Sequence, residues 1–354
     1  MSGADRSLSA LVEAAGPSAT AVTLAMTRGS SAEVRCHGRL GRAPSAPDCT
    51  PDTVFELGSV TKTFTALLLA ALAASGELTL NDPLELHLPC SWRPLTVRSG
   101  GPIRLLHLAT HTAGLRRLPP GLLASAVRAW YSNPYGAYGE VELRNAVART
   151  TVRTKPGSRY GYSNYGVALL GRLLAETGGA PYAELLAERI GRPLGLRTLA
   201  CAPDTPDRAI GHRRGRALPP WRMPGLPGAG AVRASGADLL RFLQAHVGTW
   251  PGESGDEGDG EPGGELGAAL REVQLPRLRL PGSGDEVCLV WNHRRSGDRD
   301  LFFHSGATRG FTAFVGFSPQ TESAVAALAN TGPTMDGRFL RVGYGVLTEV
   351  AGNR

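Results

Sequence analysis

Short runs of apolar and β-branched residues lie near both ends of the chain and predict strands there. Residues 19–27, ATAVTLAMT, predict one strand, and a second is expected around 31–39. Toward the C-terminus, further strands are expected at 286–293, 300–304, 310–319 and 322–330. An amphipathic helix over roughly 336–350 is expected to end the chain.

Between these ends, apolar residues recur at helical spacing. From Ser59 to Ser75–Gly76, leucines and alanines fill most positions, which predicts a helix buried nearly all round. Its richest apolar run, 66–74, is too short to span a bilayer. Further helices are expected at 103–110, 122–130, 140–150, 166–177, 181–190 and 236–247.

Strands at both ends with helices between them predict an α/β (α+β) fold: an antiparallel sheet built from both termini, flanked by helices and enclosing a mostly helical insertion. We expect residues 1–354 to form one domain, with an α/β part at about 1–58 and 286–354 and a helical part at about 59–285. The acidic, glycine-rich segment 251–267 is expected to be a mobile surface loop.

The net charge of +7 and the isoelectric point near 9.5 change this picture little. The arginines are scattered, apart from short pairs such as Arg213–Arg214, and no stripe of aromatic and basic residues accompanies them. We therefore expect neither nucleic acid nor a membrane as a partner.

Five cysteines at wide spacings form no CxxC or Cys/His cluster, so we expect reduced thiols, no metal site and no cofactor. The first twenty residues are polar and acidic where a signal peptide needs a basic start and an apolar core. These observations predict a cytoplasmic protein.

Candidate chemistry begins with the scarcity of lysine. The chain has only two lysines, Lys62 and Lys155, against 36 arginines. Lys62 follows Ser59 by three residues, so a helix would place both on one face near its N-terminus. Burial can lower the pKa of a lysine until it acts as a base, which suggests a serine nucleophile with an adjacent base. A helix-capping serine beside a solvated lysine is the alternative.

Two further short motifs follow. Tyr162 and Asn164 lie in a loop rich in glycine and proline that leads into a helix. His304, Ser305 and Gly306 lie near the end of a predicted strand, where small residues let a substrate approach the strand edge. Each motif alone is also compatible with an ordinary turn.

Three motifs follow one another along the chain: SxxK, YxN about a hundred residues later, and [K/H]-[S/T]-G on a late strand. In this order they resemble the motifs of the serine beta-lactamase and penicillin-binding-protein superfamily. The likeness is greatest to its class C branch, which includes D-alanyl-D-alanine carboxypeptidases and family VIII esterases. Segments such as FELGSVTKTFTALLLAAL and HSGATRGFTAFVGFSP extend it from about residue 20 to 330. The resemblance implies a beta-lactamase/transpeptidase-like fold.

The resemblance also implies roles. Ser59 would be the acylated nucleophile and Lys62 the base that takes its proton. Tyr162 would hydrogen-bond Ser59 and pass a proton to the leaving group, and Asn164 would orient Lys62 and the substrate's carbonyl or amide. The N–H groups of Ser59 and Ala307 would form the oxyanion hole.

The remaining residues of the late motif are expected to bind substrate, with Ser305 lining the pocket beside Gly306. His304 departs from class C beta-lactamases, which carry lysine at this position. An imidazole binds a carboxylate less strongly than an ammonium does, so we expect esters to be favoured over beta-lactams.

The expected function is hydrolysis of a small-molecule ester or amide through an acyl-Ser59 intermediate. One alternative is a transacylase or penicillin-binding-protein-type thioesterase that passes the acyl group to an amine, and another is a slow-turnover acyl-binding sensor. The pocket rim is expected from 116–140 and 212–228, with Trp130, Tyr131 or Trp221 facing the substrate.

Overall fold

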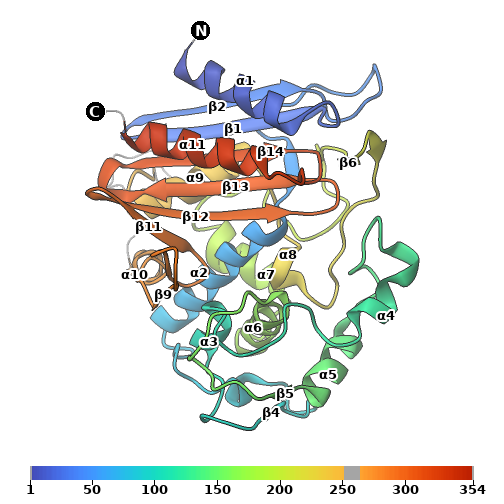
Figure 1. The fold of residues 1–354 in the computed structure, drawn as a ribbon, viewed down its shortest axis with the longest axis vertical. Coiled ribbons are helices and arrows are strands. Elements are labelled where there is room, and N and C mark those ends of the chain that lie inside the picture. The colour runs from blue at the N-terminus through green and yellow to red at the C-terminus, as the bar shows by residue number, and fades with distance from the viewer. Residues whose placement is uncertain (1, 251–263, 353–354) are drawn as a thin grey trace.

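The structure, a computed structural model, describes residues 2–250 and 264–352. Its main feature is an eight-stranded antiparallel sheet with strand order β2-β1-β14-β13-β12-β11-β10-β9, across the upper half of Figure 1. In that order the strands are Ser31–Gly38, Ala21–Arg28, Ser323–Ala329, Thr312–Ser318, Arg299–Ala307, Asn292–Ser296, Glu286–Val287 and Leu278–Arg279.

The two ends of the chain meet in this sheet. Strand β1 pairs with β2 on one side and with β14 on the other, in a register that places Val22 opposite Ala329. The Asn330 side-chain oxygen accepts hydrogen bonds from the amides of Thr20 and Ala21, both at 2.8 Å. The predicted antiparallel sheet from both termini is therefore confirmed.

Helices cover both faces of the sheet (Figure 1). Helices α1 (Gly3–Ala15) and α11 (Arg338–Gly352) lie on one face, where Leu11 and Leu347 are fully buried. Helix α9 (Gly236–Val247) covers the other face. Helix α1 was not predicted; the Ser2 side chain caps it by accepting from the amide of Asp5, whose carboxylate accepts from the amide of Ser2.

The helical part lies below the sheet in Figure 1 and surrounds α2 (Thr61–Ala74). Every residue of α2 from Thr61 to Leu72 is buried, and the helix ends at Ala74 with Ser75 as its C-cap, where the sequence predicted its end. The other predicted helices are also present. Those predicted at 122–130 and 181–190 are short α-helices, Leu122–Ala126 and Tyr182–Leu186, and each continues directly into further helical turns. The helices that pack against α2 are α6 Asn164–Thr177, α7 Tyr182–Leu186, α8 Pro227–Gly230 and α10 Gly264–Glu272, and the helical part also contains α3 Leu105–Ala109, α4 Leu122–Ala126 and α5 Glu140–Arg149.

Three two-stranded sheets complete the described elements. They pair β3 with β8, β4 with β5, and β6 with β7. Their bounds are Val54–Glu56 and Arg233–Ser235, Thr96–Val97 and Thr151–Val152, and His212–Arg213 and Arg216–Ala217.

The single strand predicted at 286–293 is wrong. The chain leaves the sheet after Val287 and turns, with Val290 at φ 68°, before β11 begins at Asn292. The Val290 amide donates to the Ala109 carbonyl at 2.9 Å, and the Trp291 ring packs on Phe317. The turn thus buries residues that a continuous strand would have aligned along the sheet.

The prediction of a mobile loop over 251–267 falls mostly outside the described residues. Its last part, 264–267, is instead the first turn of α10. Helix α10 packs on α2 and buries Gly267, Ala269 and Leu270, which explains why the helix extends into an otherwise polar segment. Within the described ranges, no helix has the length and apolar character needed to cross a membrane; the cytoplasmic location stays a prediction.

Candidate active site

Ser59 lies on a 3₁₀ turn, Gly58–Val60, directly ahead of α2 and against the end of β12. The two backbones touch: a Cβ on Gly58 would stand 2.6 Å from the Ala307 nitrogen, and one on Gly306 would stand 2.9 Å from the Ser59 nitrogen. Gly58 also has a φ of 51°, which favours glycine. The glycines therefore allow the amides of Ser59 and Ala307 to be neighbours.

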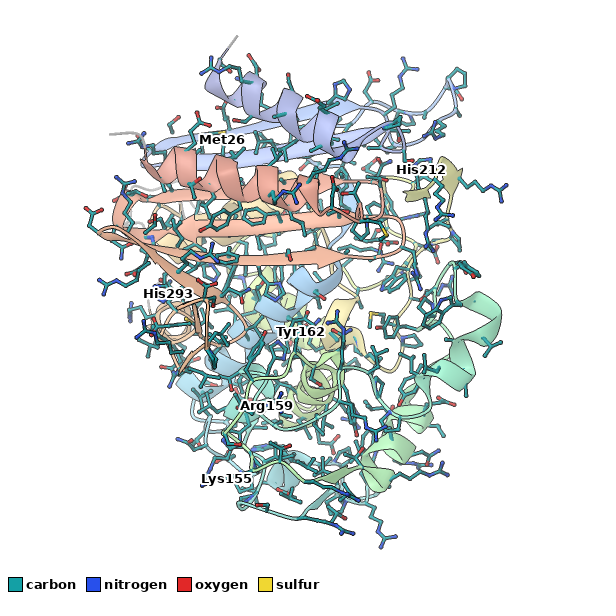
Figure 2. All side chains as sticks on the ribbon, in the orientation of Figure 1. Met26, Lys155, Arg159, Tyr162, His212 and His293 are labelled. Carbon is teal, nitrogen blue, oxygen red and sulfur yellow. The ribbon has the colours of Figure 1, made fainter. Side chains whose placement is uncertain are left out.

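Lys62 lies fully buried beneath Ser59. Its Nζ donates to Ser59 Oγ at 3.0 Å and to the carbonyl of Ala229 at 2.6 Å. Burial, aided by the positive charge of Arg117, lowers the pKa of Lys62 to about 7. A substantial fraction of this amine is therefore neutral near pH 7 and able to take a proton. By contrast Lys155 is exposed, at the far end of the helical part (Figure 2).

Tyr162 approaches Ser59 from the loop before α6, near the centre of the molecule (Figure 2). Its phenol lies close enough to Ser59 for that hydroxyl to influence the pKa of Tyr162, and its ring lies 5.3 Å from Lys62 Nζ and 5.2 Å from the Arg117 guanidinium carbon. Burial raises the pKa of Tyr162. The His111 ring packs on Tyr162, with centroids 4.5 Å apart, and Nδ1 of His111 accepts the amide of Ser163 at 3.2 Å. His111 therefore supports the loop that carries Tyr162.

The expected contact between Asn164 and Lys62 is wrong for this structure. Asn164 Nδ2 donates to the Tyr135 hydroxyl at 3.3 Å, and the buried Oδ1 that would accept from Lys62 has no partner within the described residues. The Ala229 carbonyl takes that position on Lys62. Asn164 nevertheless lines the cavity, where Oδ1 is suited to accept from a substrate N–H.

His304 is buried on β12, and both burial and the nearby Lys62 charge lower its pKa to about 3. Its imidazole is therefore neutral at neutral pH and supplies no cation. Ser305 and Gly306 follow along the same strand, and all three residues line the cavity together with Ala307.

The cavity above Ser59 has a volume of about 500 Å³ and includes every residue predicted for the site except the buried Lys62. Of the three aromatic candidates for the rim, Trp130 and Trp221 line the cavity and Tyr131 does not. The other lining residues are Arg117, Leu118, Leu122, Pro134, Tyr135, Tyr160, Val290, Asn292, Thr308, Arg309 and Leu340. Within the described ranges, no cluster of three metal-ligating side chains occurs.

A buried carboxylate joins two walls of this cavity. Glu56 accepts the amide of Trp221 at 2.7 Å and the hydroxyl of Thr308 at 2.8 Å. Arg233 lies 3.7 Å from Glu56 and donates to the carbonyl of Trp221. The Thr308 hydroxyl also accepts the amide of Gly310. Glu56 therefore fixes the turn after Ala307 against the segment that carries Trp221.

Replacing Arg117 with glutamine is expected to shift the acidic limb of the pH dependence of kcat/KM upward by roughly half a pH unit. The Arg117 charge disfavours protonated Lys62, so its loss raises the pKa of Lys62 and reduces the neutral amine at a given pH. The pH profile for a neutral ester measures the shift. Arg116→Gln, at an exposed neighbour outside the cavity lining, is the matched control. If the pH profile of Arg117→Gln were unshifted, the Arg117 charge would have no influence on the pKa of Lys62.

The sequence profile of the beta-lactamase family matches residues 12–346. The chain therefore belongs to this family. It is 28% identical, over 347 residues covering 96% of the chain and 87% of the relative, to the D-alanyl-D-alanine-carboxypeptidase/endopeptidase AmpH of Escherichia coli. It is also 28% identical to a beta-lactamase of the same organism, over 79% of the chain and 76% of the relative.

Solved structures show the same fold. A beta-lactamase/D-alanine carboxypeptidase from Yersinia pestis superposes with a TM-score of 0.78 at 21% identity, covering 99% of both chains. A class C beta-lactamase superposes with a TM-score of 0.79 at 19% identity, covering 99% of this chain and 98% of that one. The predicted membership of the class C-like branch and the predicted fold are confirmed.

Proposed function

We propose that this protein is a serine hydrolase that cleaves an ester or amide of a small molecule through an acyl-Ser59 intermediate. The observation that carries the proposal is a buried Lys62 amine with a pKa near 7, 3.0 Å from the Ser59 hydroxyl. Membership of the beta-lactamase family, with relatives named as carboxypeptidases and beta-lactamases, supports the reaction class.

In the proposed reaction, neutral Lys62 takes the Ser59 proton as Oγ attacks the acyl carbon. The amides of Ser59 and Ala307 stabilise the negative charge that develops on the carbonyl oxygen. Protonated Lys62 returns the proton through the Tyr162 phenol to the leaving group, which departs as the acyl-enzyme forms. Water, activated by the same groups, then releases the acid and regenerates Ser59.

The direct test is intact-protein mass spectrometry after exposure to p-nitrophenyl esters, thioesters and beta-lactams, combined with steady-state assays. We expect a mass increase equal to one acyl group, located on the peptide that contains Ser59, and release of p-nitrophenol with turnover. Faster turnover with added amines would favour the transacylase alternative, and a stable adduct without turnover would favour the sensor. Turnover without acylation of Ser59 would contradict the proposed mechanism.

His304→Lys is expected to raise the rate of beta-lactam acylation, relative to ester turnover, by about tenfold. A lysine would supply a charge-assisted contact to the beta-lactam carboxylate that the neutral imidazole lacks, worth roughly 1.5–3 kcal/mol before desolvation. The measurement is kcat/KM for nitrocefin and a p-nitrophenyl ester in both proteins. A wild-type enzyme that already prefers nitrocefin would contradict the expected preference for esters.

A further inference from the structure

The cavity above Ser59 contains two arginines and no carboxylate. Arg117 and Arg309 both belong to its lining, which includes no aspartate or glutamate. Neither guanidinium forms an ion pair with any residue in the described ranges, whereas Arg172 and Arg294 elsewhere are paired with acidic side chains. A cavity lined in this way attracts anions.

Arg309 is held at a defined place in this cavity. It follows Thr308, whose hydroxyl is bound to the buried carboxylate of Glu56, and lies two residues beyond Ala307. Its guanidinium carbon lies 5.4 Å from the centre of the Trp130 ring. The aromatic face holds the side chain without neutralising it, so the N–H donors at the edge of the guanidinium stay available to a ligand.

Aromatic rings surround the same end of the cavity. Tyr135 packs edge-on against Trp221, with centroids 5.5 Å apart, and both line the cavity with Trp130. Arg309 is partly exposed, and burial and the nearby Arg213 lower its pKa. These residues combine one unpaired cation with apolar walls.

Arg117 has a different surrounding. Its guanidinium lies over the Tyr162 ring and its charge acts on Lys62, next to the atoms that move protons. His304 is neutral. Of the cations that line the cavity, Arg309 is therefore the one that lies on the strand side, beyond the Ala307 amide, and away from the proton-transfer groups.

We propose that Arg309 binds a carboxylate on the acyl group of the substrate, while the chain between that carboxylate and the reacting carbonyl lies against Trp130, Tyr135 and Trp221. The substrate class is thus a half-ester, or another singly activated derivative, of a short dicarboxylic acid. This inference rests on the proposed acylation of Ser59. It assigns charge selectivity to the turn after β12 and not to residue 304.

The test compares mono-p-nitrophenyl esters of succinic, glutaric and adipic acid with neutral p-nitrophenyl esters of equal chain length. We expect the wild-type protein to have a higher kcat/KM for at least one half-ester than for its neutral counterpart. In Arg309→Gln the ratio of the two values should fall by about tenfold or more, since a charge-assisted pair is lost. Arg309→Lys should retain part of the preference, because it keeps the charge without the planar fork.

Arg116→Gln removes the same charge from an exposed neighbour of Arg117 and should leave the ratio within about twofold. The wild-type preference should also weaken between low and high salt, because exposed charges are screened; this measurement needs no variant to fold. An unchanged ratio in Arg309→Gln, or a wild-type preference for neutral esters, would overturn the assignment. Failure of neutral esters to acylate Ser59 would instead contradict the proposed function.

Discussion

Replacing Ser59 with alanine is expected to reduce turnover of p-nitrophenyl esters by a factor on the order of 10⁴ or more, without loss of the fold. Ser59 is the serine whose hydroxyl lies 3.0 Å from the buried Lys62 amine and beside the Ala307 backbone. Removing Oγ leaves the amine without a nucleophile to activate. Steady-state assays and intact-protein mass spectrometry should both show the loss.

Circular dichroism and the melting temperature of Ser59→Ala should match the wild type, because Ser59 is partly exposed and its side chain fills no core position. Ser158→Ala, in an exposed loop, is the matched control and should keep full activity. Activity of Ser59→Ala within a few-fold of the wild type would show that another group is the nucleophile.

Lys62→Arg is expected to be nearly as damaging as Lys62→Ala, with turnover reduced on the order of 10³-fold or more in both. A guanidinium stays protonated in proteins and cannot take the Ser59 proton. Lys62 is also fully buried and donates to the Ala229 carbonyl, so the larger guanidinium would have to displace neighbouring atoms. Rates measured from pH 6 to 10 should recover no activity in the arginine variant.

Lys155→Arg provides the matched control, since it makes the same change at the other lysine of the chain, which is exposed. It should leave both activity and melting temperature unchanged. If Lys62→Arg kept most of the wild-type activity while folding normally, Lys62 would act through charge or packing and not as a base.

The spacing of apolar residues along the sequence predicts most helices and strands, because a helix or strand turns residues at that spacing toward the core. Helix α2 is the clearest case: its leucines and alanines occupy every side of a fully surrounded helix. The pattern fails where tertiary contacts decide the backbone, as at Val290, whose amide bonds a carbonyl 181 residues earlier in the chain. Helix α1 does have a local sequence signal, because Ser2 and Asp5 form a capping box at its N-terminus. Testing this segment only for the pattern of a signal peptide does not reveal that signal.

The contacts of the candidate site likewise divide into those that local spacing predicts and those that it does not. Ser59 and Lys62 share one helical turn, so their spacing predicts the hydrogen bond between them. The carbonyl that holds Lys62 belongs to Ala229, 167 residues later, and no local pattern connects the two. Glu56 was missed for the same reason, because its partner Thr308 lies 252 residues later in the sequence. Arg309 was missed because the Trp130 ring beside its guanidinium is also distant in sequence.

The meeting of the two chain ends in one sheet has a consequence for biosynthesis. Thr20 and Asn330, hydrogen-bonded to each other, are 310 positions apart. A nascent chain therefore carries Ser59 and Lys62 long before Ala307 and β14 leave the ribosome, an interval on the order of tens of seconds at ordinary rates of elongation. In the proposed reaction, the nucleophile and its base are thus synthesised well before the Ala307 amide that would stabilise the oxyanion. Under the proposed mechanism, a chain terminated before Ala307 would therefore lack one of the two amides of the oxyanion hole.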